Sequence, residues 1–527
     1  MENSIQILDC TLRDGGYCNQ WNFGSANIQK ILLGLLQSKV NIIECGFLTN
    51  RVISDKDRTK FASLDDISQL IPPDRGTATF VCMVNYGEYP LDALPPHDNS
   101  SVDGIRVAFH KKDRFEALEY CKGLLTKGYK VYIQPMVSLA YSDDEFLELI
   151  ELTNTLDASA FYIVDSFGTM QRKDLMRYYS LAKQAVRKGV CLGFHSHNNK
   201  QLAHSNAQLF VDHRGERAVI IDSSVYGMGR GAGNLNTELF IDYLNLEFDT
   251  TYMVKPLLML VDEVLSIEFR NNPWGYSFPN YLSALYGCHP YYANYLDDKK
   301  TLTLEAMSDL FEMIAEDKKC EFDPNYFESL YIQYMSENKS TTYYLDSFKE
   351  TVADRSILLV APGKSSLTEK DRIHKMAVQK KAVTIGVNFS YSNIALDYVF
   401  ISNMRRYREL KHLDASSIIA TSNIKVDGVT LVDYLSLRNN REFLADNAGM
   451  MLIKLLSGCD VKEILLAGFD GYSATGQDEY TEGIESYTIK KAIAAKKNSG
   501  MDSLIREYSR GAPISFLTTP KYVGLSQ

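Results

Sequence analysis

The sequence predicts an α/β protein with two parallel sheets, the first closed into a barrel and the second open. Eight short apolar runs alternate with amphipathic segments between residues 4 and 230, as strands joined by helices do. No GxGxxG follows the first run, and the count of eight favours a closed barrel over a doubly wound sheet. Such a barrel takes about 250 residues, so the remainder of the 527 needs further domains.

The predicted strands of the first half are apolar runs of strand length. They cover residues 5–10, 40–47, 78–84, 104–109, 130–137, 160–165, 190–195 and 218–225. Helical periodicity fills most of the intervals, at residues 27–38, 115–127, 144–156 and 174–188. We therefore expect residues 1–250 to form a TIM (β/α)8 barrel.

The rest of the chain changes in character twice. Residues 251–345 hold helical stretches at 254–269 and 304–316 and a Ser/Thr-rich linker at 336–342, which predicts a helical extension packed on the barrel. Residues 346–527 alternate strands and helices again, which predicts an open, Rossmann-like α/β domain. Its strand-like runs are residues 356–361, 383–387, 398–401, 417–421 and 463–469.

Composition narrows the class of protein. Hydrophobic residues make up 45% and charged residues 23%, close to the globular average. With 56 basic and 66 acidic residues the net charge is −10, which argues against a nucleic-acid partner. No apolar run approaches the roughly 20 residues of a membrane span, the N-terminus lacks signal-peptide features, and the nine cysteines contain no CxxC pair. We expect a cytoplasmic protein with reduced thiols and no membrane span.

Polar residues follow the predicted strands at the rim that lines the active site of a barrel. Arg13 and Asp14 come after the first strand, although an Asp-Gly pair is also a common turn. His195 and His197 stand at i and i+2 on the seventh strand, so both side chains point to one face. Two neutral imidazoles there suit one divalent ion; the alternative is a pair of polar side chains at the end of the strand.

Further strands bring polar groups to the same rim. Glu44 is a carboxylate in the apolar second strand and needs a partner, for which Arg13 is suited. Ser166 lies at the end of the sixth strand. After the eighth strand a Gly-rich loop ends in Gly233 and Asn234, and its backbone N–H groups suit an anion.

Together these residues resemble the DRE-TIM metallolyase superfamily. That superfamily holds 4-hydroxy-2-oxovalerate aldolases, hydroxymethylglutaryl-CoA lyase, and the isopropylmalate and homocitrate synthases. Its Asp-x-Thr-Leu-Arg-Asp-Gly signature matches residues 9–15, its second-strand Glu matches Glu44, its His-x-His matches residues 195–197, and its eighth-loop Gly-Asn matches residues 233–234. The resemblance covers about residues 1–290.

The resemblance implies a divalent-metal-dependent aldolase, a carbon–carbon lyase that joins a pyruvate-type enolate to an aldehyde or catalyses the reverse cleavage. The implied Mn²⁺ or Mg²⁺ ligands are Asp14, His195 and His197, with Asn234 near or in the coordination shell, and Gly233 and Asn234 are also implied substrate-binding residues. The metal would act as a Lewis acid on the enolate. Arg13 would stabilise the same oxyanion, Glu44 would hold Arg13 in place, and Ser166 would contact the carboxylate of the 2-oxo acid.

The resemblance leaves alternatives open. Where the aldolases carry a His shortly after Arg-Asp-Gly, this chain has Tyr17, so the general base is Tyr17, Tyr276 or Tyr281 of the extension, or metal-bound water. Tyr276 and Tyr281 equally suit packing onto the barrel. The His-Ser-His-Asn-Asn run favours an aldolase over a Claisen-type acyl-CoA condensing synthase. A non-catalytic scaffold is the third interpretation.

The C-terminal part carries a weaker pattern. Gly363 and Ser365 join a predicted strand to a helix, a junction that suits a phosphate, although Leu358 excludes a P-loop. Gly449 opens a later helix, and Asp470 stands in a Gly-x-Asp-x-Tyr run. This arrangement is similar to the Rossmann-like domains of bacterial sialyltransferases. It implies a nucleotide or nucleotide-sugar ligand and a role in surface-polysaccharide biosynthesis; a structural domain is the alternative. We also expect a homo-oligomer.

Overall fold

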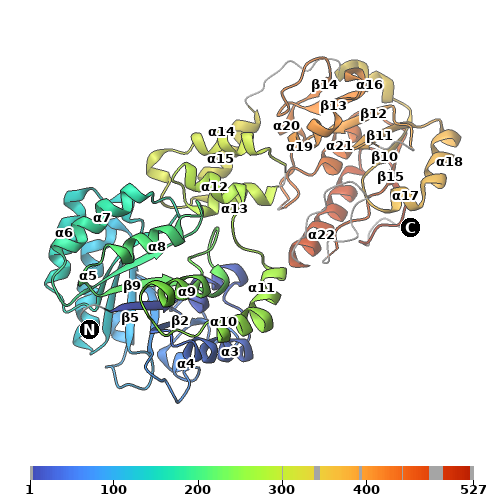
Figure 1. The fold of residues 1–527 in the computed structure, drawn as a ribbon. Helices are drawn as coiled ribbons and strands as arrows, with labels where there is room; N and C mark the ends of the chain where they lie inside the picture. Colours follow the sequence, from blue (N-terminus) through green and yellow to red (C-terminus); the bar gives the residue numbers. More distant parts are fainter. Residues whose placement is uncertain are drawn as a thin grey trace. The chain divides into compact units, whose positions relative to one another are not determined.

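Eight parallel strands close into a barrel in the first half of the chain (Figure 1). The computed structural model describes residues 4–299, 301–336, 345–390, 394–441, 443–473 and 491–522. The barrel strands are β1 (Ile5–Asp9), β2 (Ile42–Leu48), β4 (Thr79–Asn85), β5 (Gly104–Phe109), β6 (Lys130–Pro135), β7 (Ala160–Asp165), β8 (Cys191–Ser196) and β9 (Val219–Ser223). β1 pairs with both β9 and β2, which closes the ring. The predicted TIM barrel is confirmed, and its strands begin and end within about two residues of the predicted positions.

The pleat of these strands divides the apolar core into two layers. Successive side chains of a strand point to opposite faces. Leu8, Ile42 and Ile220 therefore meet in one cluster inside the barrel, whereas their neighbours Ile7 and Ile43 pack against the surrounding helices. Alternate residues of each strand thus point their side chains into the interior of the barrel.

Helices cover the outside of the barrel. They are α3 (Ser25–Gln37), α4 (Leu64–Ser68), α5 (Arg114–Thr126), α6 (Asp143–Asn154), α7 (Arg172–Ala185), α8 (Ala203–Asp212) and α9 (Thr237–Glu247). The apolar residues of α3 recur every three or four positions, so one face of the helix is buried. Between β4 and β5 the structure has only the short turn η1 (Leu91–Ala93), and the short strand β3 (Lys60–Phe61) pairs with β2.

The segment after the barrel is helical, as predicted. Where the sequence predicts one helix over 254–269, α10 (Lys255–Leu260) continues through a π-helical turn, η5 (Val261–Leu265), into α11 (Ser266–Asn271). The helices α12 (Phe278–Leu285), α13 (Pro290–Lys299), α14 (Leu304–Glu312) and α15 (Pro324–Ser336) follow. Apart from Ser336, the predicted linker at 336–342 lies outside the described residues.

An open parallel sheet occupies the last part of the chain, in the order β14–β13–β12–β11–β10–β15–β16. Its strands are β10 (Ser356–Val360), β11 (Val383–Val387), β12 (Tyr398–Ile401), β13 (Ile418–Thr421), β14 (Thr430–Val432), β15 (Glu463–Ala467) and β16 (Ile514–Phe516). The helices around it are α16 (Leu345–Val352), α17 (Ser365–Thr368), α18 (Lys370–Lys380), α19 (Met404–Leu410), α20 (Tyr434–Leu437), α21 (Ala448–Ser457) and α22 (Lys491–Tyr508). The predicted second parallel sheet is confirmed, and β14 and β16 extend it at both edges.

The chain divides into two compact units. One contains residues 1–298 and 314–322, and the other contains residues 299–313 and 323–527. Helices predicted as a single extension are thus shared between the units, and the three-part division at 250 and 345 stays a prediction. Within the described ranges, no helix is long and apolar enough to cross a membrane.

Candidate metal centre and active site

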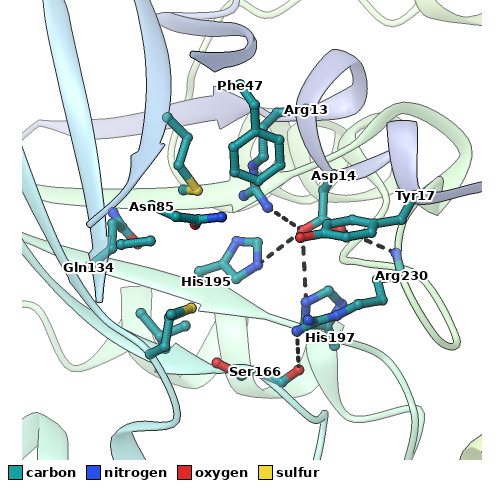
Figure 2. A pocket seen from close by; sticks show the side chains of 14 residues that line it. Arg13, Asp14, Tyr17, Phe47, Asn85, Gln134, Ser166, His195, His197 and Arg230 are labelled. Atoms are coloured by element: carbon teal, nitrogen blue, oxygen red, sulfur yellow. Dashed lines mark hydrogen bonds and ion pairs between the residues drawn. The ribbon is translucent and has the colours of Figure 1, made fainter. Parts of the chain in front are cut away.

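Three of the residues singled out in the sequence meet at the carboxyl end of the barrel (Figure 2). Asp14 ends the short helix α1 (Thr11–Asp14) directly after β1, and His195 and His197 come from β8 and the residue beyond it. Nε2 of His195 lies 3.4 Å from Oδ2 of Asp14, and Nε2 of His197 lies 3.7 Å from the same oxygen. All three side chains are buried. The structure therefore brings the predicted metal ligands to one point.

The donor set suits a small divalent cation. A carboxylate oxygen and two imidazole nitrogens converge, and a backbone bridge joins His197 to Asn234. Oδ1 of Asn234 is buried and has no hydrogen-bond partner among the described residues. A buried amide oxygen without a donor costs free energy, which a cation would recover. Mixed oxygen and imidazole ligands are those that divalent first-row metals accept, so these residues fit the predicted ion.

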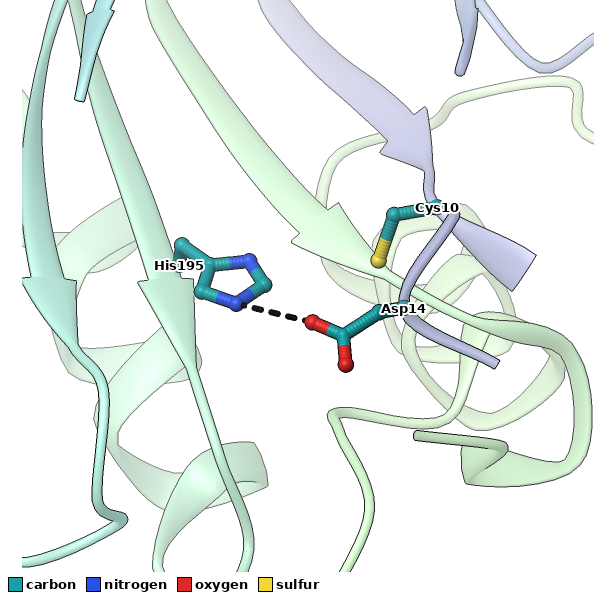
Figure 3. A group of neighbouring side chains, drawn as sticks. All are labelled: Cys10, Asp14 and His195. Carbon is teal, nitrogen blue, oxygen red and sulfur yellow. Dashed lines mark ion pairs between the residues drawn. The ribbon is translucent and has the colours of Figure 1, made fainter. Parts of the chain in front are cut away.

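Cys10 stands beside the same group (Figure 3). Its Sγ, a carboxylate oxygen of Asp14 and a ring nitrogen of His195 all lie within 4.8 Å of one another. The thiol donates to the carbonyl oxygen of Ser223 at 3.2 Å, and burial raises the pKa of Cys10 well above its usual value. Because the thiolate is the form that binds metals, Cys10 suits the wall of the site rather than the ligand set.

The charges of the three central residues differ because their neighbours differ. Burial would raise the pKa of Asp14, but Arg13 and the two histidines hold it well below its usual range. Burial lowers the pKa of His197 to about 3, which leaves its imidazole neutral. For His195, burial is outweighed by hydrogen bonds to Asp14 and Asp222, which raise the pKa of this imidazole. The site thus contains an ionised carboxylate and a neutral imidazole, both suited to a cation.

Arg13 is fixed between two carboxylates. Its Nη1 lies 2.7 Å from Oδ2 of Asp14, and its Nε donates to Oε2 of Glu44 at 2.8 Å. The pairing of Arg13 and Glu44 that the sequence suggests is present. A guanidinium held in this way presents its charge without having to reorient during a reaction.

The same network continues through two residues that the sequence analysis missed. Arg106 of β5 donates through Nη1 to Oε2 of Glu44 at 2.8 Å, and its Nη2 bonds to Oδ2 of Asp222 on β9. Oδ2 of Asp222 also lies 2.9 Å from Nδ1 of His195. A charged residue inside an apolar strand run is the signal that marks Glu44, and both Arg106 and Asp222 carry it.

A cavity of about 50 Å³ opens beside the central residues. Part of its wall is apolar, and it comes from Phe47, Met83, Ala108, Met136 and Val164. Asn85 and Gln134 add amides, and Nε2 of Gln134 is buried with no partner in the described part of the chain. Both amides lie at or near the ends of strands. The sequence shows a polar residue at the end of each apolar run, but such a residue suits a turn as well as a site. Apolar side chains with a few convergent polar groups are the lining that small-molecule sites have.

Of the three tyrosines considered as general base, Tyr17 alone lines the described cavity. Burial raises the pKa of Tyr17 to about 12, so at neutral pH its hydroxyl is protonated and is a hydrogen-bond donor. Tyr276 is half exposed and packs edge-on against Phe278, with 6.0 Å between the ring centroids. Tyr281 lies on α12 and is not among the lining residues.

Ser166 and the Gly-rich loop serve to hold the site together. Ser166 lines the cavity, and its Oγ accepts the N–H of Val137 at 2.9 Å. Gly233 has a φ of +82°, and its N–H donates to the carbonyl oxygen of Arg230 at 3.1 Å. The N–H of Arg230 in turn donates to Oδ1 of Asp14 at 3.1 Å. The loop therefore positions Asp14, and the amides of Arg230 and Gly233 are used within the protein.

The C-terminal residues singled out in the sequence lie around the ends of β10 and β15. Asp470 accepts the N–H of Ser365 at 2.8 Å and also the hydroxyl of the same residue. A Cβ at Gly363 would collide with the loop after β15, and one at Gly449 would press on Phe469. These glycines permit close packing, and Asp470 takes the N–H that a phosphate would need. A ligand role for the four residues stays a prediction.

Comparisons with known proteins match part of the chain. The HMGL-like family model matches residues 110–260. The 4-hydroxy-2-oxovalerate aldolase of Carboxydothermus hydrogenoformans is 26% identical over 289 residues, which cover 51% of this chain and 80% of that protein. The protein of the same name from Geobacillus genomosp. 3 is 26% identical over 303 residues, covering 51% and 83%. The solved N-terminal domain of a candidate aldolase from Bacteroides vulgatus is 26% identical at a TM-score of 0.48, covering 57% of this chain and 98% of that one.

Proposed function

We propose that the N-terminal half of this chain is an enzyme of the DRE-TIM metallolyase superfamily and, within it, a divalent-metal-dependent aldolase. The proposed reaction joins the enolate of a pyruvate-type 2-oxo acid to an aldehyde, or cleaves the product. The observation that carries the proposal is the convergence of His195, His197 and Arg13 on Oδ2 of Asp14 at the mouth of the barrel.

The residues around this point have separate roles in the proposed reaction. Asp14, His195 and His197 would hold a divalent cation such as Mn²⁺ or Mg²⁺, which would supply Lewis-acid stabilisation of the enolate. Arg13 donates charge-assisted hydrogen bonds to the same oxyanion, and Glu44 keeps its guanidinium aimed at that point. Binding and orientation thus fall to groups that the protein has already fixed.

The remaining lining residues suit the two carbonyl substrates. The sequence resemblance makes Ser166 a contact of the carboxylate of the 2-oxo acid, and Ser166 lines the cavity. Tyr17 keeps its proton at neutral pH, so its hydroxyl suits a donor to the aldehyde oxygen better than a base. Gly233 and Asn234 support the metal ligands from the loop after β9.

Two other functions compete with the aldolase. A Claisen-type acyl-CoA condensing synthase uses the same enolate chemistry with a different pair of substrates. A scaffold without activity is disfavoured, because burying Arg13, Asp14 and Glu44 costs free energy that an apolar interior would avoid. Among the enzymes, the acceptor is what distinguishes the candidates.

Exchange of the methyl protons of pyruvate into D₂O tests the enolate step without knowledge of the acceptor. With Mn²⁺ present, we expect the full-length protein to catalyse the exchange, and we expect Asp14→Asn and His195→Ala to abolish it with unchanged far-UV circular dichroism. Asp157→Asn, which alters a carboxylate whose side chain is 95% exposed, is the matched control. Absence of exchange in the wild-type protein with Mn²⁺ or Mg²⁺ would overturn the aldolase.

For the C-terminal unit we propose a ligand site at the carboxyl ends of β10 and β15. Strands β11 to β14 lie on one side of β10, and β15 and β16 lie on the other, so the strand order reverses there. Open parallel sheets bind ligands at such a reversal. The sequence resemblance makes a nucleotide or nucleotide-sugar the ligand and surface-polysaccharide biosynthesis the setting.

Thermal shifts with a panel of nucleotides and nucleotide-sugars test the C-terminal proposal. A ligand that binds the folded state raises the melting temperature as its concentration exceeds the dissociation constant. If no member of the panel raises the melting temperature, the C-terminal unit is a structural domain.

Light scattering tests the predicted homo-oligomer, and fractionation of cells tests the predicted cytoplasmic location.

A further inference from the structure

Arg230 is a cation at the mouth of the barrel whose side chain contacts only neutral groups among the described residues. Its Nη2 donates to the carbonyl oxygen of Ser166 at 3.0 Å, and its guanidinium carbon lies 5.4 Å from the ring centroid of Tyr17. Nη1 lies 3.5 Å from Nε2 of His289. Among the described residues the guanidinium has no carboxylate within ion-pair distance, and Nε is buried without a partner. The guanidinium of Arg13, in contrast, is paired with two carboxylates.

The backbone fixes Arg230 to the site. Its N–H donates to Oδ1 of Asp14, whereas its side chain extends toward Ser166. Figure 2 shows Arg230 beyond Tyr17 and His197, on the opposite side of the cavity from Gln134. The side chain of Arg230 is partly exposed, whereas Asp14 and His197 are buried. Arg230 thus lies nearer the entrance than the metal ligands do.

The groups around the guanidinium do not supply a counter-charge. His289, in the segment between α12 and α13, packs its ring against Phe167 with 5.6 Å between the centroids. Burial and the charge of Arg230 lower the pKa of His289 to about 2, so its imidazole is neutral. A partly buried cation among neutral rings and a carbonyl is an incomplete ion pair, and an anion would complete it.

We propose that Arg230 binds an anionic group, a carboxylate or a phosphate, on the acceptor aldehyde. This inference rests on the proposed aldolase function and names the class of its second substrate. The 2-oxo acid occupies the deeper position against the metal ligands and Arg13, so the group that reaches the entrance belongs to the substrate that enters second. A neutral aldehyde leaves the guanidinium without a partner.

Two matched pairs of aldehydes test the proposal with full-length protein, Mn²⁺ and pyruvate. Succinic semialdehyde and butanal differ by a carboxylate in place of a methyl group, and glycolaldehyde phosphate and glycolaldehyde differ by the phosphate. We expect kcat/KM to be about 10- to 100-fold higher for at least one anionic member than for its neutral partner, the range that a charge-assisted hydrogen bond supports. The pair that shows the difference identifies carboxylate or phosphate as the group.

Substitution of Arg230 tests whether this residue causes the preference for the anionic aldehyde. Arg230→Gln is expected to remove the preference by lowering kcat/KM for the anionic aldehyde, and Arg230→Lys is expected to restore part of it. Arg51→Gln is the matched control, because the Arg51 side chain is 66% exposed and pairs with Glu88. The Arg51→Gln variant is expected to show the same preference between aldehydes and the same pyruvate exchange rate as the wild-type protein.

The failure of this inference is distinguishable from the failure of the proposed function. If the wild-type protein does not exchange the methyl protons of pyruvate, the aldolase itself is overturned. If exchange occurs but neither anionic aldehyde is preferred, or Arg230→Gln keeps the preference, the role of Arg230 is overturned. A higher KM for pyruvate in Arg230→Gln with an unchanged preference among aldehydes would assign Arg230 to the 2-oxo acid and also overturn it.

Discussion

Oδ2 of Asp222 lies 2.9 Å from Nδ1 of His195, and the imidazole therefore presents Nε2 to Asp14. The two residues come from neighbouring strands, β9 and β8. A carboxylate behind a histidine fixes the orientation of the ring and raises its basicity as a ligand. Asp222 is thus part of the candidate metal centre without touching the point where the metal would bind.

Asp222→Asn is expected to weaken Mn²⁺ binding about 10- to 100-fold, the usual effect of removing such a partner. The amide keeps the size of the side chain but loses its charge, so the ring is held less firmly. Titration of free Mn²⁺ by electron paramagnetic resonance measures the affinity, with Asp157→Asn as the control. Equal affinities for the two variants would show that Asp222 does not position His195.

Arg106→Met is expected to destabilise the protein by about 3–5 kcal/mol, because it removes the arginine partner of buried Asp222 and leaves buried Glu44 with Arg13 alone. Urea unfolding, followed by a signal from the N-terminal unit, measures the change in the free energy of unfolding. Arg177→Met removes an exposed ion pair with Asp143 and is expected to cost less than about 1 kcal/mol. A similar small loss for both variants would contradict a structural role for the buried network.

The sequence predicts the strands of the barrel closely because each is buried on both faces and is a nearly continuous apolar run. The three-residue strands β14 and β16 are too short to show any periodicity, and they were not predicted. The pairing of Arg106 with Asp222 spans 116 positions and depends on the closure of the barrel. Local patterns locate Asp14 and the histidines, because the rim of the barrel concentrates functional residues, but they do not reveal which loop residue, such as Arg230, turns inward.

Asp9 makes the stability of the barrel depend on pH. Burial raises the pKa of this carboxyl from 3.8 to about 6, although Thr237 and Thr11 hydrogen-bond to it. Between those values the folded state binds the proton and the unfolded state does not, so stability falls as pH rises through 6. The loss is complete above pH 7 and amounts to roughly 2–4 kcal/mol.

Asp9→Asn should remove this part of the pH dependence. The variant is expected to match the wild-type protein at pH 4 and to exceed its stability at pH 8. Thermal unfolding at a series of pH values measures the difference between the two curves. A difference that does not change with pH would show that Asp9 has its ordinary pKa in the folded protein.

Gly233→Ala tests the Gly-rich loop. Gly233 has a φ of +82°, and a Cβ there would collide with the carbonyl oxygen of Gly227. Gly24 has the same φ of +82°, with a ψ of 136° and open space around it, so Gly24→Ala shows the cost of backbone strain without a collision, about 1–3 kcal/mol. We expect Gly233→Ala to lose more stability than Gly24→Ala and also to weaken Mn²⁺ binding. Equal losses in thermal unfolding would show that the loop accommodates the methyl group.

The pairing of β1 with both β2 and β9 has a consequence for synthesis of the protein. Residues 5–9 leave the ribosome well before residues 219–223, which are their second neighbour in the sheet. Until that strand emerges, one edge of β1 has unpaired N–H and C=O groups, which invite association with other chains. High contact order also slows folding. Nascent chains that end before residue 219 are therefore the ones expected to need a chaperone.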